Sequence, residues 1–183
     1  GVAFDNEIEF NTAPSETKDI EKEIDEQLVK EKQVLVFLNS RKRAEGQAKK
    51  SSEKTMHHIN ETNKTKLEKI ANSILSVLEQ PTSQCHSLAD TIKLGSAFHH
   101  AGLLPKQREL VEENFRKGVI KIICATPTLA AGVNTPADLV VIPSLYRYGQ
   151  YGMDLIPVRE YKQMCFTKDT LISIDEGLID IKK

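Results

Sequence analysis

The sequence predicts an α/β domain with a mostly parallel central β-sheet flanked by helices. Short, wholly apolar runs recur along the chain, and such runs are typical of strands that are buried on both faces of a parallel sheet. Amphipathic helical stretches separate these runs, which favours helical crossovers between parallel strands. The length of 183 residues, with 39% apolar and 28% charged residues, fits one globular domain with short additions.

The first part of the chain predicts a linker, one helix and one strand. Residues 1–16 are mostly polar and predict a linker or a strand. A helix capped by Ser15 or Thr17 is expected to run to about Lys30, because apolar residues recur there at helical spacing. The all-apolar run 34–38 then predicts a buried strand.

Two further helices are expected before the middle of the chain. Asn39 and Ser40 can cap a helix that begins at about Arg41 and continues into the fifties. A stripe of apolar residues predicts a second helix over 62–79, which Pro81 would stop. Residues 81–95 are expected to form a loop or short turns.

The second half continues the alternation of strands and helices. A small strand is predicted at 96–98, followed by a helix from Pro105 to about Lys117, with Gly118 as its terminator. Two more strands are expected, over 119–125 and 139–142.

The charge and cysteine content limit the possible classes of protein. The net charge is −1, so the chain as a whole is not a polycation. Charge is unevenly distributed, however, because residues 40–54 hold six bases against two acids. Three cysteines without a close pair predict neither a disulfide framework nor a zinc site. The sequence has no long apolar run and no basic-then-apolar leader at 1–9, so we expect no membrane partner and a cytoplasmic setting.

Four loops are predicted at the carboxyl ends of strands, where parallel sheets bind ligands. They contain hydroxyls, imidazoles, an arginine and a glycine, groups that suit a phosphate backbone. The four loops are residues 39–41, 99–102, 126–128 and 144–152.

Several of these segments resemble motifs of one enzyme family. Residues 36–41 (VFLNSR) resemble helicase motif IV, residues 98–103 (FHHAGL) the block that follows it, and residues 125–136 (ATPTLAAGVNTP) motif V. Their order and spacing resemble the second RecA-like domain of superfamily-2 helicases, over roughly residues 1–164. The wording is most similar to the Ski-type branch, and in particular to archaeal fork-repair DNA helicases.

The resemblance implies a role for each matching position. Ser40, Arg41, His100, Gly102, Thr126 and Thr128 would lie along the nucleic-acid backbone. Gly132 and Asn134 would face ATP in the cleft between two motor domains. The parent enzyme would use ATP and Mg²⁺ to move 3′-to-5′ along single-stranded or forked DNA, with the first RecA-like domain of the same polypeptide as its partner. No G-x-x-x-x-G-K-[ST] loop occurs, so we expect the magnesium site outside this chain.

The resemblance breaks off inside motif VI. Gln163 matches the first residue of that motif, which reads Gln-x-x-Gly-Arg-x-Gly-Arg, but after Met164 the chain continues with Cys165-Phe166-Thr167 and the glycines and arginines are missing. Residues 165–172 (CFTKDTLI) resemble the start of an intein, with Cys165 as its nucleophile and Met164 as the last host residue. The expected domains are therefore a motor domain over 1–164 and an intein fragment over 165–183. Without the motif VI arginines and an intein's later His and Asn, we expect this chain neither to hydrolyse ATP nor to splice.

Other interpretations of the same residues remain open. Cys124 is expected in the core and Cys85 in a loop or at a helix end, while His57 and His58 are expected on a solvated helix surface. The tyrosines at 146, 148 and 151 could stack on bases or pack a loop. The chain could also be a non-catalytic nucleic-acid-binding or interaction module on a RecA-like scaffold, and the substrate could be RNA.

Overall fold

The computed structural model describes five stretches of the chain: residues 20–126, 137–142, 146–149, 152–155 and 171–174. The predicted linker or strand at 1–16 lies outside them. The strands within these stretches are β1 (Val34–Phe37), β2 (Ser96–His99), β3 (Ile122–Ala125), β4 (Leu139–Ile142), β5 (Tyr146–Gly149), β6 (Gly152–Leu155) and β7 (Leu171–Ile174). The helices are α1 (Ile20–Val29), α2 (Arg41–Thr55), the short 3₁₀ helix η1 (Met56–His58), α3 (Glu61–Leu75), α4 (Ser83–Lys93) and α5 (Pro105–Arg116).

A five-stranded sheet in the order β2-β3-β1-β4-β7 forms the centre of the domain. All four neighbouring pairs run parallel, which confirms the predicted α/β fold. Phe37 and His99 both pair with Ala125 in the last row of the register between β1, β3 and β2. The loops that follow these three strands therefore start side by side at one edge of the sheet.

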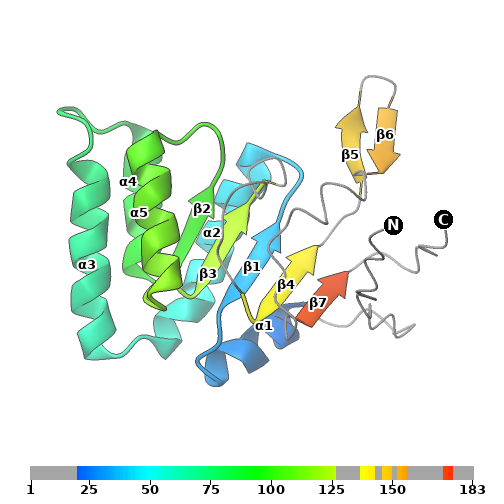
Figure 1. The fold of residues 1–183 in the computed structure, drawn as a ribbon, viewed down its shortest axis with the longest axis horizontal. Helices are drawn as coiled ribbons and strands as arrows, with labels where there is room; N and C mark the ends of the chain where they lie inside the picture. The colour runs from blue at the N-terminus through cyan, green and yellow to red at the C-terminus, as the bar shows by residue number, and fades with distance from the viewer. Residues whose placement is uncertain (1–19, 127–136, 143–145, 150–151, 156–170, 175–183) are drawn as a thin grey trace, which may run out of the picture.

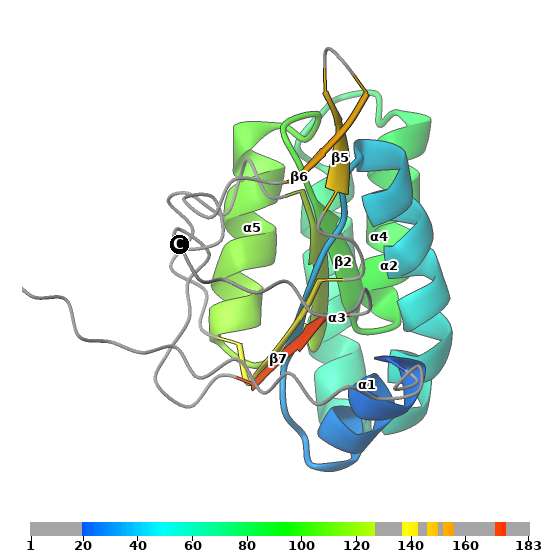
Figure 2. The same cartoon turned by 90° about the vertical axis from the view of Figure 1, so that its right-hand side faces the viewer.

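Helices cover both faces of this sheet (Figures 1 and 2). In Figure 2, α5 lies on one face, and α1, α2 and α4 lie on the other. Helix α2 packs over β2 and β3, α1 packs against β4, and α3 packs on the outside of α4. Because both faces are covered, all residues of β1, β2, β3 and β4 are buried, as the wholly apolar runs predict.

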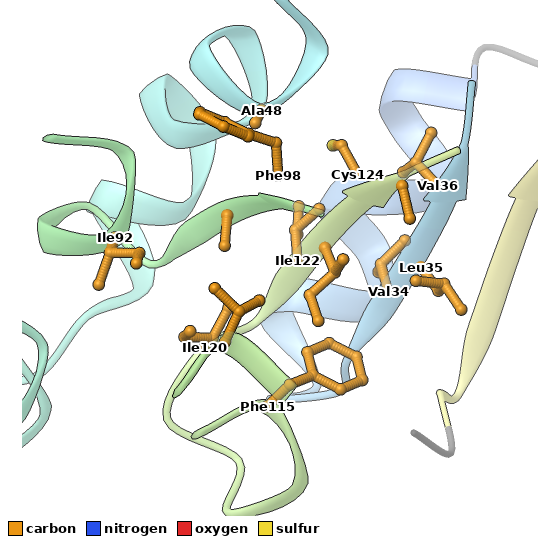
Figure 3. Packing of buried hydrophobic residues seen from close by; sticks show 14 of the residues in the cluster. Val34, Leu35, Val36, Ala48, Ile92, Phe98, Phe115, Ile120, Ile122 and Cys124 are labelled. Atoms are coloured by element: carbon orange, nitrogen blue, oxygen red, sulfur yellow. The ribbon is translucent and has the colours of Figure 1, made fainter. Parts of the chain in front are cut away.

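The core is continuous across the sheet. Phe98 and Cys124 point toward Ala48 of α2, whereas Phe115 of α5 lies on the opposite side (Figure 3). Phe98 and Phe115 are both 0% exposed, so truncating either to alanine would cost about 3–5 kcal/mol of folding free energy.

Helix α4 corrects the expectation of a loop over 81–95. Thr82 caps it by accepting a hydrogen bond from the backbone N–H of Cys85. Its buried residues Cys85, Leu88, Ala89 and Ile92 have helical spacing, but Pro81 and the many small polar residues conceal this short pattern. Helix α3 ends at Leu75 instead of 79, and the Ser76 hydroxyl donates a hydrogen bond back to Ser73 O at 3.0 Å.

Two strand pairings were not expected from the sequence. The predicted loop 144–152 contains β5, which forms an antiparallel hairpin with β6, and this hairpin projects beyond the sheet (Figure 1). Strand β7 lies within the segment 165–183 and pairs in parallel with β4. The domain boundary at 164 stays a prediction, but the described part of that segment lies on the edge of the central sheet.

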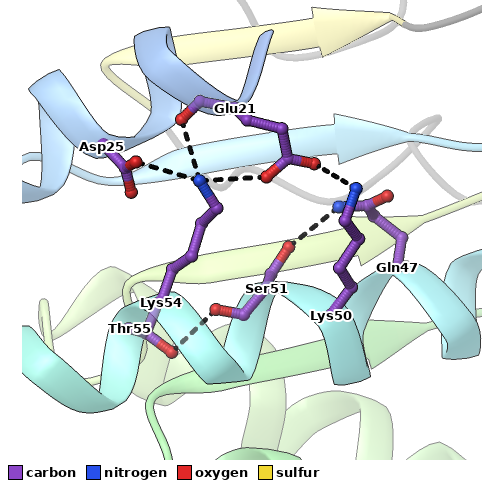
Figure 4. Close-up of polar contacts among 7 residues, drawn as sticks. All are labelled: Glu21, Asp25, Gln47, Lys50, Ser51, Lys54 and Thr55. Atoms are coloured by element: carbon purple, nitrogen blue, oxygen red, sulfur yellow. Dashed lines mark hydrogen bonds and ion pairs between the residues drawn. The ribbon is translucent and has the colours of Figure 1, made fainter.

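An ion-pair network joins α1 to the carboxyl half of α2 (Figure 4). Lys54 Nζ lies 2.9 Å from Asp25 Oδ2 and 3.1 Å from Glu21 Oε2, and Lys50 Nζ lies 2.7 Å from Glu21 Oε1. Partial burial alone would raise the pKa of Glu21, but hydrogen bonds from the two lysines hold it below its usual 4.5. Partial burial alone would lower the pKa of Lys54, but Asp25 and Glu21 raise it above its usual 10.5.

Candidate nucleic-acid interface

The candidate interface lies at the carboxyl edge of the central sheet. Ser40 follows β1, His100 directly follows β2, and Thr126 directly follows β3. The backbone connects these ends, because Leu38 N donates to Ala125 O at 2.8 Å and Thr126 N donates to His99 O at 3.3 Å. The structure therefore brings together the first residues of three of the predicted loops.

The amino end of α2 presents three basic residues to solvent. Ser40 caps the helix, and its Oγ accepts a hydrogen bond from Arg43 N at 3.2 Å. Arg41, Lys42 and Arg43 are exposed, and no carboxylate among the described residues forms an ion pair with them. The first turn of α2 contains no acidic residue.

This arrangement opposes the usual electrostatics of a helix. The amino end of a helix carries a partial positive charge, so each cation there is unfavourable by about 0.3–1 kcal/mol. Exposed N–H groups and three cations together form a site suited to an anion.

The His100 side chain holds the loop after β2 through two hydrogen bonds. The His100 side chain is 0% exposed, and its Nε2 lies 2.8 Å from Glu45 Oε1. The Gly102 N–H donates to His100 Nδ1 at 3.0 Å. His100 is therefore buried, and direct contact between its ring and a nucleic acid would require this arrangement to open.

His99 and Thr126 are also buried at this edge. His99 is 3% exposed, and its Nε2 lies 2.6 Å from Glu112 Oε1 of α5. Burial lowers the pKa of His99 below its usual 6.5, and the hydrogen bond to Glu112 opposes this only in part. Thr126 is 9% exposed, so among the described members of the predicted interface Ser40, Arg41 and Gly102 are the exposed ones.

Neither His57 and His58 nor the two described cysteines belong to the predicted interface. His57 and His58 are exposed in η1, as expected, and Cys124 lies in the core, where burial raises its pKa to about 12. Cys85 lies in the first turn of α4, buried beside Gln107 Nε2 at 3.2 Å. Burial alone would raise the pKa of the Cys85 thiol, but hydrogen bonds from Thr82 and Gln107 lower it below its usual 9.0.

Several predicted site residues lie outside the described residues. These are Thr128, Gly132, Asn134, Gln163 and Cys165. Tyr146 and Tyr148 belong to β5, whose backbone alone is described, and Tyr151 is not described. The roles of all these residues therefore stay predictions.

Sequence reasoning missed three polar partners at this edge. Glu45 and Glu112 bind the two histidines, and Gln84 Nε2 donates to Glu45 Oε1 at 2.9 Å. Glu45 follows Arg41 by four residues, which places both on one face of α2, so its proximity to the site was readable from the sequence. The other two lie on helices whose docking the sequence does not specify.

The described residues show neither a metal-ligand cluster nor a membrane-spanning helix. In that part of the chain, no three His, Cys, Asp or Glu side chains gather closely enough to hold a metal ion. None of its helices is both long and apolar enough to cross a membrane.

The parallel sheet, the helices on both faces and the polar loops at its carboxyl edge define a RecA-like α/β domain. Residues 68–165, more than half of the chain, match the family model of the helicase conserved C-terminal domain. The chain therefore belongs to this family, as a second RecA-like domain of the superfamily-2 helicases.

Curated relatives agree with this assignment. The chain is 45% identical over 130 residues to the ATP-dependent DNA helicase Hel308 of Pyrococcus horikoshii. The aligned region covers 71% of this chain and 18% of the relative. It is 45% identical over 129 residues to Hel308 of Methanococcus vannielii, with 70% and 17% covered. The match with Hel308 of Methanocella arvoryzae is 43% over 133 residues, with 72% and 18% covered. The chain thus spans less than a fifth of the length of these relatives.

Proposed function

We propose that this chain is the second motor domain of an ATP-dependent DNA helicase and binds the nucleic-acid backbone at the carboxyl edge of its sheet. The observation that carries the proposal is the amino end of α2, where Arg41, Lys42 and Arg43 are exposed and lack carboxylate partners among the described residues. Such a site neutralises phosphates, which dominate nucleic-acid affinity. The match to relatives named as ATP-dependent DNA helicases supports the same function.

ATP would bind between this domain and a first RecA-like domain of the same polypeptide. Gly132 and Asn134 are the residues proposed to face it, and Mg²⁺ would be held by the other domain. Closure and opening of that cleft would move the strand across the phosphate-binding loops. Because half of such a channel is present here, we propose that this chain binds nucleic acid weakly and does not hydrolyse ATP.

DNA is the proposed substrate, and forked DNA in repair with 3′-to-5′ movement is the proposed context. The relatives are named DNA helicases, which supports DNA over RNA, whereas the phosphate-binding residues of the interface do not discriminate between them. A cytoplasmic setting belongs to the same proposal.

The proposal is tested with Thr126→Ala in the intact parent enzyme. Thr126 begins the loop after β3, directly beside the backbone of His99. If this loop contacts the translocated strand, ATP hydrolysis stimulated by DNA falls more than basal hydrolysis. An equal loss of both rates would show that Thr126 serves folding or nucleotide binding instead.

We further propose that residues 165–183 are the start of an intein. The family match ends at residue 165, next to the proposed junction of Met164 and Cys165, which supports this boundary. In an intein, Cys165 would attack the preceding carbonyl. The intact mass of the chain after incubation with a thiol tests whether Cys165 can carry out this attack. A competent Cys165 would lead to release of the segment 165–183, whereas the Cys165→Ala variant would keep its full mass. We expect no release from this chain.

A non-catalytic binding or interaction module is the alternative function. It shares the scaffold and the basic edge, but it needs no ATP. A Walker A motif and a DExx box elsewhere in the parent gene would exclude it.

A further inference from the structure

Strand β4 has two hydrogen-bonding edges, and the backbone contacts show which residues face each of them. Leu139 N donates to Gln33 O at 3.2 Å, on the side of β1. The backbone N–H and C=O groups of successive residues in a strand point to opposite edges. Leu139 and Val141 therefore face β1, whereas Val140 and Ile142 direct their backbone groups to the outer edge of β4.

This outer edge requires a partner. Val140 is 0% exposed and Ile142 is 2% exposed, and an unpaired backbone group at a buried position costs about 1–3 kcal/mol. The four residues of β4 are all apolar, so no charge on the strand discourages pairing with another chain. An open β4 edge would thus be both costly and prone to association.

Strand β7 occupies the outer edge of β4 (Figure 1). All four residues of β4 pair in parallel with those of β7, with Val140 opposite Ile172. Since Val140 faces β7, the backbone groups that face it in return are those of Leu171 and Ser173, on either side of Ile172. The N–H of Ile172 itself points away from β4.

We propose that Leu171–Ile174 serve the interrupted motor domain as the fifth strand of its sheet and protect the outer edge of β4 until the inserted element is excised. This inference rests on the proposed intein start at Cys165. The family match ends at residue 165, so β7 lies beyond the matched region and yet completes the sheet to which that region belongs. The element is anchored on the domain that it interrupts.

Excision of the element would reopen this edge. Loss of the segment 165–183 removes β7 and leaves the outward backbone groups of Val140 and Ile142 without their present partners. The domain that carries a paired β7 is therefore more stable, and less prone to self-association, than the same domain with the edge open.

Hydrogen exchange of single amides in the nitrogen-15-labelled 183-residue chain tests the inference. In the wild type, the amides of Val140 and Ile142 should exchange as slowly as those of Leu139 and Val141, to within about tenfold, because both edges of β4 are paired. Slow exchange at the outward amides is the result that β7 has to produce.

The variant Ser173→Pro removes an N–H that faces β4 and should detach the strand. Exchange at Val140 and Ile142 should become at least about tenfold faster, the factor expected for the loss of one backbone hydrogen bond. Leu139 and Val141 should change little, and their continued protection shows that the variant is folded.

The matched control is Ile172→Pro. It introduces the same ring one residue earlier, where the N–H points away from β4, and an edge strand tolerates proline at such a position. Val140 and Ile142 should stay protected in this variant. In sedimentation experiments, Ser173→Pro should self-associate at concentrations at which Ile172→Pro remains monomeric.

One measurement needs no variant, and the outcomes separate this inference from the proposed intein. The wild-type chain should show a nuclear Overhauser effect between backbone protons of Val140 and Ser173. Its absence, together with fast exchange at Val140, would overturn the anchoring and leave the intein start intact, because the thiol test of Cys165 does not depend on β7.

Equal exchange rates at Val140 in Ser173→Pro and Ile172→Pro would also overturn the anchoring. A parent gene that continues without the later blocks of an intein would overturn the intein start, and with it the role of β7 as a strand of an inserted element.

Discussion

The two ends of α2 differ in how their basic residues are used. At the carboxyl half, Lys50 and Lys54 form ion pairs with Glu21 and Asp25 of α1. Lys54 lies in the last turn of α2, and Glu21 lies in the first turn of α1, where each charge is favoured by its helix dipole. This end follows the electrostatic rules for a stable fold.

The amino end of α2 departs from the same rules. Three exposed bases at 41–43 occupy the end of the helix that disfavours cations, and no acid stands in its first turn. Local conflict of this kind is expected where a residue serves a ligand instead of the fold. The difference indicates that the bases of one end stabilise the domain, whereas those of the other are available to phosphates.

The largest expected effect is the loss of DNA binding on removal of the basic amino end. The variant Arg41→Ala/Lys42→Ala/Arg43→Ala should bind single-stranded DNA roughly a hundredfold more weakly at 0.1 M salt, because each phosphate contact to a single strand contributes roughly fivefold. The slope of log affinity against log salt should become shallower by about two for the same reason. Anisotropy titrations at several salt concentrations measure both.

A control with the same charge change uses α3. Lys64, Lys66 and Lys69 are exposed along that helix, away from the carboxyl edge of the sheet. Their triple alanine variant should retain most of the affinity. Equal losses in the two triple variants would mean that net charge, and not the amino end of α2, governs binding.

Ser40 separates capping from phosphate contact. Ser40→Ala removes the acceptor for Arg43 N and should lower the free energy of unfolding by about 1 kcal/mol. Ser40→Asp retains a capping oxygen but adds a negative charge, so it should keep stability and weaken DNA binding. Urea denaturation and anisotropy test the pair, and unchanged DNA affinity in Ser40→Asp would place the strand elsewhere.

Lys54 should have the opposite profile to the amino-end bases. Lys54→Met removes a charge that lies within 3.1 Å of both Glu21 and Asp25, and it should cost about 1 kcal/mol of stability, the upper range for a partly exposed pair. DNA affinity should change little. Lys49→Met, on the same helix and exposed, is the control for stability and should be nearly neutral.

The smallest expected effects concern the pH dependence of stability. His99 at the carboxyl edge of the sheet and Glu21 in the ion-pair network should lose their contributions in different pH ranges. The folded pKa of His99 lies below its usual 6.5, so its contribution is present above pH 6.5 and is lost as pH falls through the folded value. The folded pKa of Glu21 lies below its usual 4.5, so its contribution is lost only at still lower pH. In both windows the unfolded state binds more protons, so the free energy of unfolding decreases as the pH is lowered.

Urea denaturation between pH 8 and pH 3 measures these windows. Lys54→Met should reduce the acid sensitivity below pH 4.5 and leave the decline below pH 6.5 unchanged. A variant that alters the upper window instead would contradict the assignment of these groups.

Strands β1 and β4 were predictable because burial on both faces of a sheet requires wholly apolar runs. The segments 34–38 and 139–142 became β1 and β4 almost unchanged. Ser40 was also predictable as a cap, since a small hydroxyl residue follows a strand and precedes a helix. Helix α4 was missed because it contains few apolar residues and these are interspersed with small polar ones.

The environment of each site residue was less predictable than its position. The motif resemblance places His100 at the interface, but its burial depends on Glu45 and Gln84, which come from two other helices. Such contacts depend on how helices dock on the sheet, and local sequence patterns do not specify this docking. The pairing of β7 with β4 is likewise a long-range contact.

Mapping of the DNA contact by amide chemical shifts tests the central claim most directly. Titration of the nitrogen-15-labelled chain with a short single-stranded DNA should shift the amides of residues 40–43, 101–102 and 126 at the carboxyl edge of the sheet. The amide chemical shifts around Lys50 and Lys54 should not change. Shifts concentrated at the carboxyl half of α2 or along α3, with the amino end of α2 unaffected, would contradict the account.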